Sequence, residues 1–282
     1  MKLQERAAPF GGLASGAAED DLTLARAVTG FVHKTLTIAE VEVRKLRHDA
    51  TELVTRAVQP VLWLLVFGQV FSRTRAIPTG DVRYLDFMAP GILAQSVLFI
   101  AIFYGIAVIW ERDLGVLHKF LASPTPRTAL VLGKGLAAGI RALAQTIIIY
   151  TLALLLGVKI IWNPLALASV MIVVLLGAAL FATLSLIIAC LVKTRERFMG
   201  IGQVLTMPLF FASNAIYPIT MMPDWLQILA KMNPLTYEVD ALRALMVTGV
   251  SSYGVGVDVA ILGITLTILV LIGGRLYPNV VV

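Results

Sequence analysis

Long apolar runs alternate with short polar stretches along this chain, and the apolar runs predict membrane-spanning helices. A helix needs about 20 predominantly apolar residues to cross a bilayer. Six runs come close to that length or exceed it, at roughly 54–72, 86–109, 135–157, 164–192, 198–217 and 255–275. The sequence therefore predicts an all-α polytopic membrane protein with six transmembrane helices.

The residues before the first run have a different pattern. Over 22–52, apolar residues are interspersed with basic and acidic ones, which is typical of an amphipathic helix lying in the membrane interface. A soluble helix packed on a loop is the alternative. Residues 1–21 are rich in Ala and Gly and lack the apolar segment of a signal peptide, so they predict a flexible cytoplasmic tail. Residues 22–282 are then a single transmembrane domain.

Prolines interrupt the chain between the fifth and sixth runs. Two short segments follow them, at 225–232 and 235–246, with apolar residues at helical spacing and charges on another side. Neither segment is long enough to span a membrane. We expect a re-entrant pair of short helices on, or dipping into, the outer leaflet. Trp225 and Tyr237 would lie at the interface, where such amphipathic rings are enriched.

Composition and charge agree with this arrangement. The chain is 59% hydrophobic and only 14% charged, against about 25% charged residues in soluble domains. The net charge of +6 is spread between the apolar runs, which favours cytoplasmic loops and anionic lipid over nucleic acid. Placing both termini inside the cell puts most of the 23 Lys and Arg residues on the cytoplasmic side. The prediction is therefore N-in and C-in.

The polar stretch between the second and third runs predicts a short helix. Leu114, Leu117 and Leu121 lie three and four residues apart, on one side of a helix. Pro124 and Pro126 then stop that helix, because proline lacks the N–H group and clashes with the preceding turn. A stiff amphipathic helix between two spans can carry force to or from a soluble partner.

Catalytic and metal chemistry are not indicated. Cys190 is the single cysteine, and the three histidines are isolated, so no metal-ligand spacing occurs. Gly133-Lys134-Gly135 lacks the upstream glycine and the following Ser or Thr of a phosphate-binding loop. We expect this chain not to be an enzyme and to bind no cofactor.

Several motifs carry a family resemblance through their order and spacing. They are Phe87-Met-Ala-Pro90-Gly91, Glu111-Arg112-Asp-Leu-Gly115, Leu121-Ala-Ser-Pro124, Tyr217-Pro218-Ile219, Met222-Pro223-Asp-Trp225-Leu226, Asn233-Pro234-Leu235-Thr236-Tyr237 and Val239-Asp240-Ala241-Leu242-Arg243. Over roughly 25–275 the chain resembles the ABC-2 type permease family, and within it the branch of daunorubicin-resistance permeases and nodulation-factor exporters.

The resemblance implies the membrane subunit of an exporter. Two copies of a separate ATP-binding-cassette ATPase would drive it, with ATP and Mg bound by that partner, and a second permease, identical or paralogous, would complete a dimer. It also implies a multi-pass protein of a prokaryotic inner or plasma membrane, and a coupling helix after the second span. The residues expected to couple the chain to the ATPase, by contact or, for the two prolines, by stiffening the end of the helix, are Glu111, Arg112, Leu114, Leu117, His118, Lys119, Phe120, Leu121, Pro124 and Pro126. An ordinary cytoplasmic loop is the alternative.

The apolar spans and short loops favour a hydrophobic or amphiphilic small molecule, a drug or lipid-like compound, as the exported substrate. A polysaccharide or lipid-linked glycan is the alternative within this class, and a non-transporting scaffold or channel component is the alternative outside it. Polar and aromatic residues within the spans would line the path, unless they only make interhelical hydrogen bonds or face lipid. They are Gln95, Tyr104, Gln203, Phe210, Phe211 and Asn214, and Gln145 is a further amide within a span.

Overall fold

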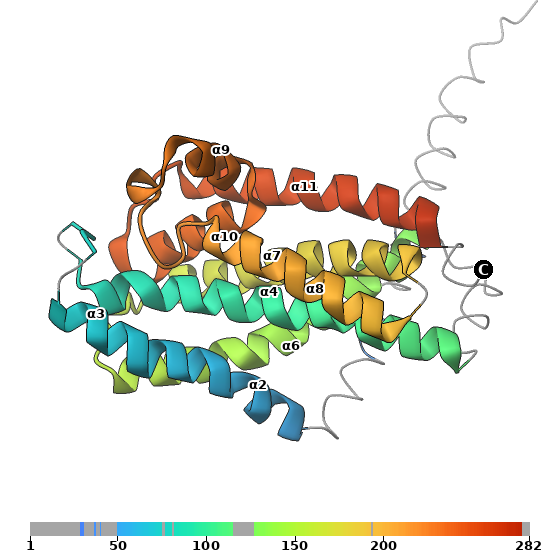
Figure 1. Cartoon of the computed structure of the whole chain (residues 1–282), viewed down its shortest axis with the longest axis horizontal. Coiled ribbons are helices and arrows are strands. Elements are labelled where there is room, and N and C mark those ends of the chain that lie inside the picture. Colours follow the sequence, from blue (N-terminus) through green and yellow to red (C-terminus); the bar gives the residue numbers. More distant parts are fainter. Residues whose placement is uncertain are drawn as a thin grey trace, which may run out of the picture.

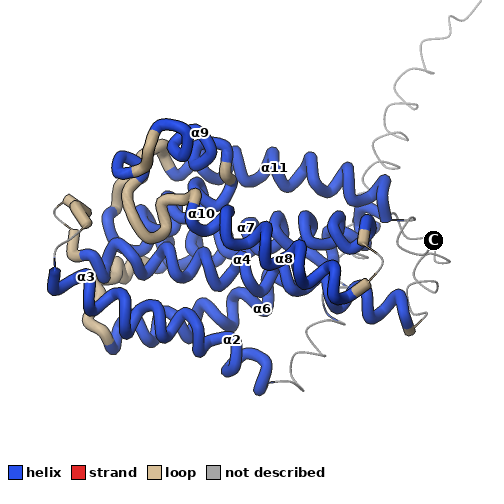
Figure 2. Tube along the Cα trace, viewed as in Figure 1, coloured by secondary structure: helices blue, strands red, loops and turns tan. Residues whose placement is uncertain are grey.

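The computed structural model describes residues 29–30, 37, 40, 50–74, 77–80, 82–114, 127–192 and 194–277. Within these ranges the secondary structure is helical and contains no strand, which confirms the all-α prediction for this part of the chain (Figure 2). The predicted tail 1–21 lies outside the described residues. So does most of the predicted interfacial helix 22–52.

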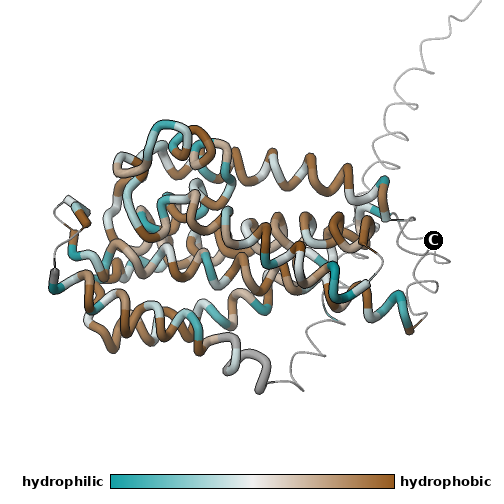
Figure 3. The backbone as a smooth tube through the Cα atoms, viewed as in Figure 1, coloured by the Kyte–Doolittle hydropathy of each residue, from teal (hydrophilic) through white to brown (hydrophobic). Residues whose placement is uncertain are grey.

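The long helices run side by side along the long axis of the molecule (Figure 1). The loops between them gather at its two ends, and hydropathy follows the same division, with apolar residues along the helices and most polar ones near the ends (Figure 3). The elements are α2 (Ala50–Leu62), the π-helical turn η1 (Trp63–Gly68), α3 (Gln69–Thr74), α4 (Tyr84–Asp113), α6 (Arg127–Leu155), α7 (Pro164–Leu191), α8 (Arg195–Phe211), the 3-10 turn η2 (Ile219–Met221), α9 (Asp224–Met232), α10 (Pro234–Arg243), the π-helical turn η3 (Ala244–Thr248) and α11 (Val255–Leu276).

Four of these helices, α4, α6, α7 and α11, are long and apolar enough to cross a membrane. They coincide with the second, third, fourth and sixth apolar runs. The first run forms the consecutive elements α2, η1 and α3, whose apolar portion, 57–73, is shorter. The fifth forms α8, which has 17 residues. The chain is thus a polytopic helical protein with four such helices among the described residues.

Helix α7 is the centre of the bundle, and α4, α6 and α11 all pack against it. Its start is set by Asn163, whose side chain accepts a hydrogen bond from the Leu165 N–H at 3.0 Å, and by Pro164 in the first turn. Gly135 and Gly139 of α6 face α7. A methyl group on Gly135 would lie 3.2 Å from the Ala179 carbonyl oxygen, so the missing side chain lets the two helices approach closely.

Helix α8 ends at Phe211, six residues before the end of the fifth apolar run. Pro208 lies inside its last turn and contributes no N–H to the helical ladder. The Asn233 amide satisfies two of the terminal carbonyl groups, donating to Leu209 O at 2.6 Å and Ala212 O at 2.8 Å. The same side chain caps α10 by accepting from the Leu235 N–H at 3.0 Å. One residue therefore joins the end of α8 to the start of α10.

The two predicted short helices correspond to α9 and α10, at the end of the molecule that also holds α3 (Figure 1). Trp225 on α9 is exposed, whereas α10 is buried along most of its length among α4, α7 and α11, its charged residues included. Arg243 donates to Asn214 O at 2.6 Å and Phe87 O at 3.3 Å, and its guanidinium lies 3.7 Å from the centre of the Phe87 ring. The charges of α10 thus lie inside the bundle and not on a separate polar face.

Candidate functional site

Ion pairs join three helices at the end of the bundle opposite α9. We call this the charged cluster: Glu111, Arg112 and Asp113 of α4, Lys134 of α6 and Arg195 of α8. The ammonium group of Lys134 lies 2.5 Å from the Glu111 carboxylate, and Arg195 lies 2.8 Å from Asp113. Arg112 also contacts Asp113, at 3.1 Å, and donates to Val192 O at the end of α7 at 3.4 Å. The cluster thus connects α4 with α6, α7 and α8.

The two main pairs of the charged cluster differ in burial. The side chains of Lys134 and Glu111 are 4% and 12% exposed, whereas those of Arg195 and Asp113 are 33% and 36% exposed. Arg195 also lies 3.6 Å from the centre of the Trp110 ring, a cation–π contact.

Most of the expected ATPase-contacting residues lie outside the described residues, namely Leu117, His118, Lys119, Phe120, Leu121, Pro124 and Pro126. Glu111, Arg112 and Leu114 are described. Glu111 and Arg112 belong to the charged cluster. Leu114, the cap of α4, is an apolar side chain 70% exposed next to three charged residues. An exposed leucine at the end of a helix is compatible with contact to another protein.

The residues expected to line a substrate path lie on α4, on α8 and just after the end of α8. Gln95 and Tyr104 are buried on α4, and the Tyr104 ring lies under the Arg141 guanidinium at 5.3 Å. Gln203 is exposed on α8. Phe210 and Phe211 lie near the end of α8, where the Phe210 ring is 6.0 Å from the ring of Trp63. Asn214 is buried, and its carbonyl accepts from Arg243 at the α9 end.

One of those residues, Gln95, lines a cavity of about 230 Å³ between α2, α4 and α6. We call it the amide cavity. Its wall consists of Thr55, Gln59, Pro60, Gln95, Ser96, Phe99, Ile100, Phe103 and Gln145. The pattern of Gln95, Phe99 and Phe103 at four-residue spacing places one face of α4 toward it. Gln59, Phe99 and Phe103 were not predicted as site residues, although this spacing is visible in the sequence.

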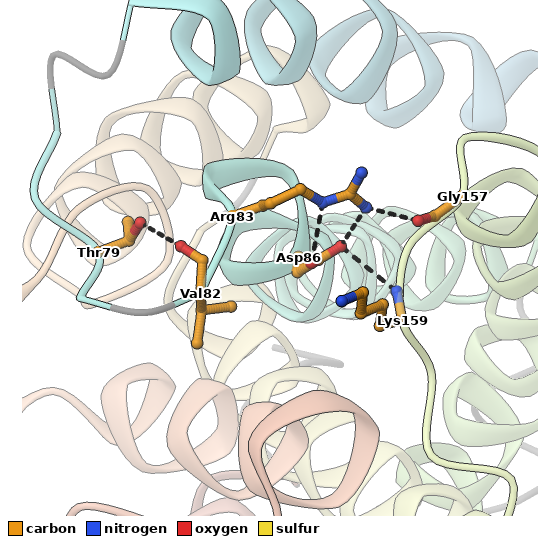
Figure 4. Close-up of polar contacts among 6 residues, drawn as sticks. All are labelled: Thr79, Val82, Arg83, Asp86, Gly157 and Lys159. Atoms are coloured by element: carbon orange, nitrogen blue, oxygen red, sulfur yellow. Dashed lines mark hydrogen bonds and ion pairs between the residues drawn. The ribbon is translucent and has the colours of Figure 1, made fainter.

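The opposite end of α4 is held by a second polar network (Figure 4). Asp86, buried in the first turn of α4, pairs with Arg83 at 2.8 Å and accepts from the backbone N–H of Lys159 at 3.3 Å. Arg83 donates in addition to the Gly157 carbonyl. The hydrogen bond to Asp86 is the main cause that raises the pKa of the Arg83 guanidinium. This network ties the start of α4 to the loop between α6 and α7.

Among the described residues, no group of three or more His, Cys, Asp or Glu side chains is arranged to hold a metal ion. Cys190 is a buried free thiol. The two features of this part of the chain with candidate roles are therefore the charged cluster and the amide cavity.

Comparison with known proteins gives a consistent result. The model of the ABC-2 type transporter family matches residues 33–247. The ycf38 protein of Cyanophora paradoxa, named as a transport permease, is 29% identical over 203 residues, covering 71% of this chain and 70% of that protein. The daunorubicin resistance ABC transporter permease protein DrrB1 of Streptomyces coeruleorubidus is 26% identical, covering 83% and 82%. Nodulation protein J of Rhizobium leguminosarum bv. trifolii is 27% identical, covering 69% and 73%.

Proposed function

Because this chain belongs to the ABC-2 type transporter family, we propose that it is the transmembrane permease subunit of an ATP-binding-cassette exporter. Its homologues are named as transport permeases, and permeases of this family work with ATP-binding-cassette subunits; in our proposal this chain is likewise a transport component and not itself an ATPase. In our proposal two copies of that ATPase drive the export of a hydrophobic or amphiphilic small molecule, a drug or lipid-like compound. The molecule would leave the cytoplasm or the inner leaflet of a prokaryotic cell membrane.

The observation that supports this coupling most directly is the charged cluster. Residues 115–126, which include the expected coupling helix, are flanked in the chain by the exposed Leu114 and by the start of α6. The two main ion pairs join α4 to α6 and α4 to α8 at this end. A displacement of the coupling segment by an ATPase would therefore act on three helices together, one of which, α4, also forms a wall of the amide cavity.

The proposed topology adds two membrane spans to the four long helices. The α2–η1–α3 run and α8 would be the first and fifth spans, giving six crossings with both termini in the cytoplasm. α9 and α10 would be the re-entrant pair on the outer side. In this orientation the charged cluster is cytoplasmic and the Arg83–Asp86 network is external. A second permease, identical or paralogous, would complete the dimer, and residues 22–52 would be the interfacial helix of a single domain spanning 22–282.

Replacing both Leu117 and Leu121 with Asp is expected to uncouple the complex. Charged side chains cannot occupy an apolar groove on the ATPase, and loss of such anchors weakens helix-in-groove docking strongly. In proteoliposomes that contain the chain and its cassette ATPase, substrate-stimulated ATP hydrolysis and export should fall at least about tenfold. Copurification of the ATPase with the variant measures the loss of docking directly.

Met232→Asp is the matched control, because Met232 is 76% exposed on α9, at the other end of the molecule. It should leave substrate-stimulated hydrolysis unchanged. Full stimulation in the Leu117→Asp, Leu121→Asp variant would contradict the docking role. If the unmodified chain binds and stimulates no cassette ATPase, it is a scaffold or channel component. Export of a lipid-linked glycan without export of small amphiphiles would favour the glycan alternative.

A further inference from the structure

The amide cavity contains buried polar atoms that no described residue satisfies. Gln145 is 0% exposed, and neither its carbonyl oxygen nor its amide nitrogen has a hydrogen-bond partner. Gln95 is 4% exposed, and its side-chain oxygen also lacks a partner. Buried amides are hydrogen-bonded in most proteins, because an unmet donor or acceptor away from water is costly. Two such side chains on the wall of one cavity indicate a group that supplies the missing bonds.

The rest of the cavity wall indicates what surrounds that group. Phe99 and Phe103 follow Gln95 on the same face of α4, with their ring centres 6.1 Å apart and the ring planes tilted by 34°. Both rings are partly exposed, and Gln59 on α2 is exposed as well. Rings of this kind pack against flat apolar molecules. The wall therefore combines a buried amide pair with a more accessible aromatic edge.

The described residues of the cavity wall also carry no charge. Each of its nine residues is apolar or an uncharged polar residue. A charged ligand group would lose its hydration without gaining an opposite charge, which is unfavourable in a membrane interior. An uncharged group with a hydrogen-bond donor or acceptor loses less hydration free energy on entering the cavity. Such a group can also form hydrogen bonds with Gln95 and Gln145 directly. The composition of the wall thus discriminates against ionic ligands.

We propose that the amide cavity binds uncharged amphiphiles, with a carbonyl or hydroxyl group on Gln95 and Gln145 and a flat apolar body against Phe99 and Phe103. This inference rests on the proposed export function and makes its substrate class specific. The site lies within one permease chain, between α2, α4 and α6. An amphiphile can therefore bind before the ATPase acts.

Equilibrium binding of tritiated Nile red, an uncharged flat amphiphile with a carbonyl group, tests the site. The chain is assembled with its ATPase in nanodiscs without ATP, and binding to empty nanodiscs is subtracted. Gln145→Leu and Gln95→Leu should each raise the dissociation constant about tenfold, because each removes a hydrogen bond between the ligand and a buried amide. Gln69→Leu, at an exposed glutamine of α3 outside the cavity, should leave it unchanged.

A fold defect is distinguished from loss of the site by thermal unfolding. Gln145→Leu removes two unpartnered buried atoms, so it should unfold at or above the temperature of the unmodified chain while binding Nile red less tightly. Tritiated tetraphenylphosphonium, a cationic probe, should bind at least about tenfold more weakly than Nile red, because the wall offers no carboxylate.

Each contrary result has a distinct meaning. If the unmodified chain does not bind Nile red, or if both glutamine variants bind it normally, the cavity is not a binding site. If tetraphenylphosphonium binds as tightly as Nile red and depends on Gln145, the assigned ligand class is wrong. If Nile red binds as expected but no amphiphile is exported with ATP, the proposed function fails and the binding site stands.

Discussion

Replacing Lys134 with Met is expected to lower the free energy of unfolding by about 1.5–3 kcal/mol, because it removes a charged hydrogen-bond donor from a largely buried carboxylate. The Glu111 side chain is only 12% exposed and lies 2.5 Å from the Lys134 ammonium group. Methionine keeps most of the volume of the lysine side chain, so the loss of stability comes from removing the charge and not from creating a cavity. Denaturant unfolding of the purified chain in detergent measures it.

Two further variants make this prediction specific. Combining Glu111→Gln with Lys134→Met removes both charges and should recover part of the lost stability, because a neutral amide is less costly to bury than a carboxylate that has lost the ammonium group. Arg197→Met changes an exposed basic residue in the first turn of α8, so it should change stability by less than about 0.5 kcal/mol. If the Lys134 variant is as stable as the Arg197 variant, the buried pair does not hold α4 to α6.

Gly91→Ala is expected to lower the free energy of unfolding by about 3 kcal/mol, near the upper end of overpacking effects. A methyl group at Gly91 would overlap the carbonyl oxygen of Ala215 and lie 2.7 Å from its Cα atom. The contacted atoms are backbone, so a change of rotamer cannot relieve the overlap. The neighbouring Asn214 carbonyl is also held by Arg243. Thermal unfolding of the purified variant measures the cost.

The same substitution at Gly263 should have the opposite sign. Gly263 lies within α11, and no atom of the described residues outside its own stretch of helix lies within 4 Å of the position of an added methyl group. Alanine favours the helix over glycine, so Gly263→Ala should raise the free energy of unfolding by up to about 1 kcal/mol. Equal losses at Gly91 and Gly263 would show that the helix backbone, and not the contact with Ala215, determines the effect.

The apolar pattern predicted where the helices lie better than where they end. Four runs correspond to α4, α6, α7 and α11 because an apolar stretch of sufficient length has few other stable forms in a membrane. The end of α8 at Phe211 was not predicted. It depends on the Asn233 amide, which is more than 20 residues further along the chain and bonds to the Leu209 and Ala212 carbonyls. Local sequence does not contain such long-range partners.

The motifs that carry the family resemblance acquire a physical explanation only in three dimensions. Phe87 and Gly91 open α4, and they contact residues much later in the chain. Arg243 lies over the Phe87 ring, and Gly91 makes room for Ala215. Periodicity predicts which residues share a face of α4, but the rotation of that helix is set by its packing partners. For the same reason Gln95 was predicted to line a substrate path, but the cavity wall that it forms with Gln145 was not predicted.

The difference in burial between the two ion pairs of the charged cluster has a consequence for ionic strength. The Arg195–Asp113 pair is about one-third exposed, so water and mobile ions reach both groups and weaken their attraction as salt rises. The Lys134–Glu111 pair is largely shielded from those ions. Rising salt therefore weakens the link between α4 and α8 before the link between α4 and α6. At this end of the bundle, α8 is the helix most easily released from α4.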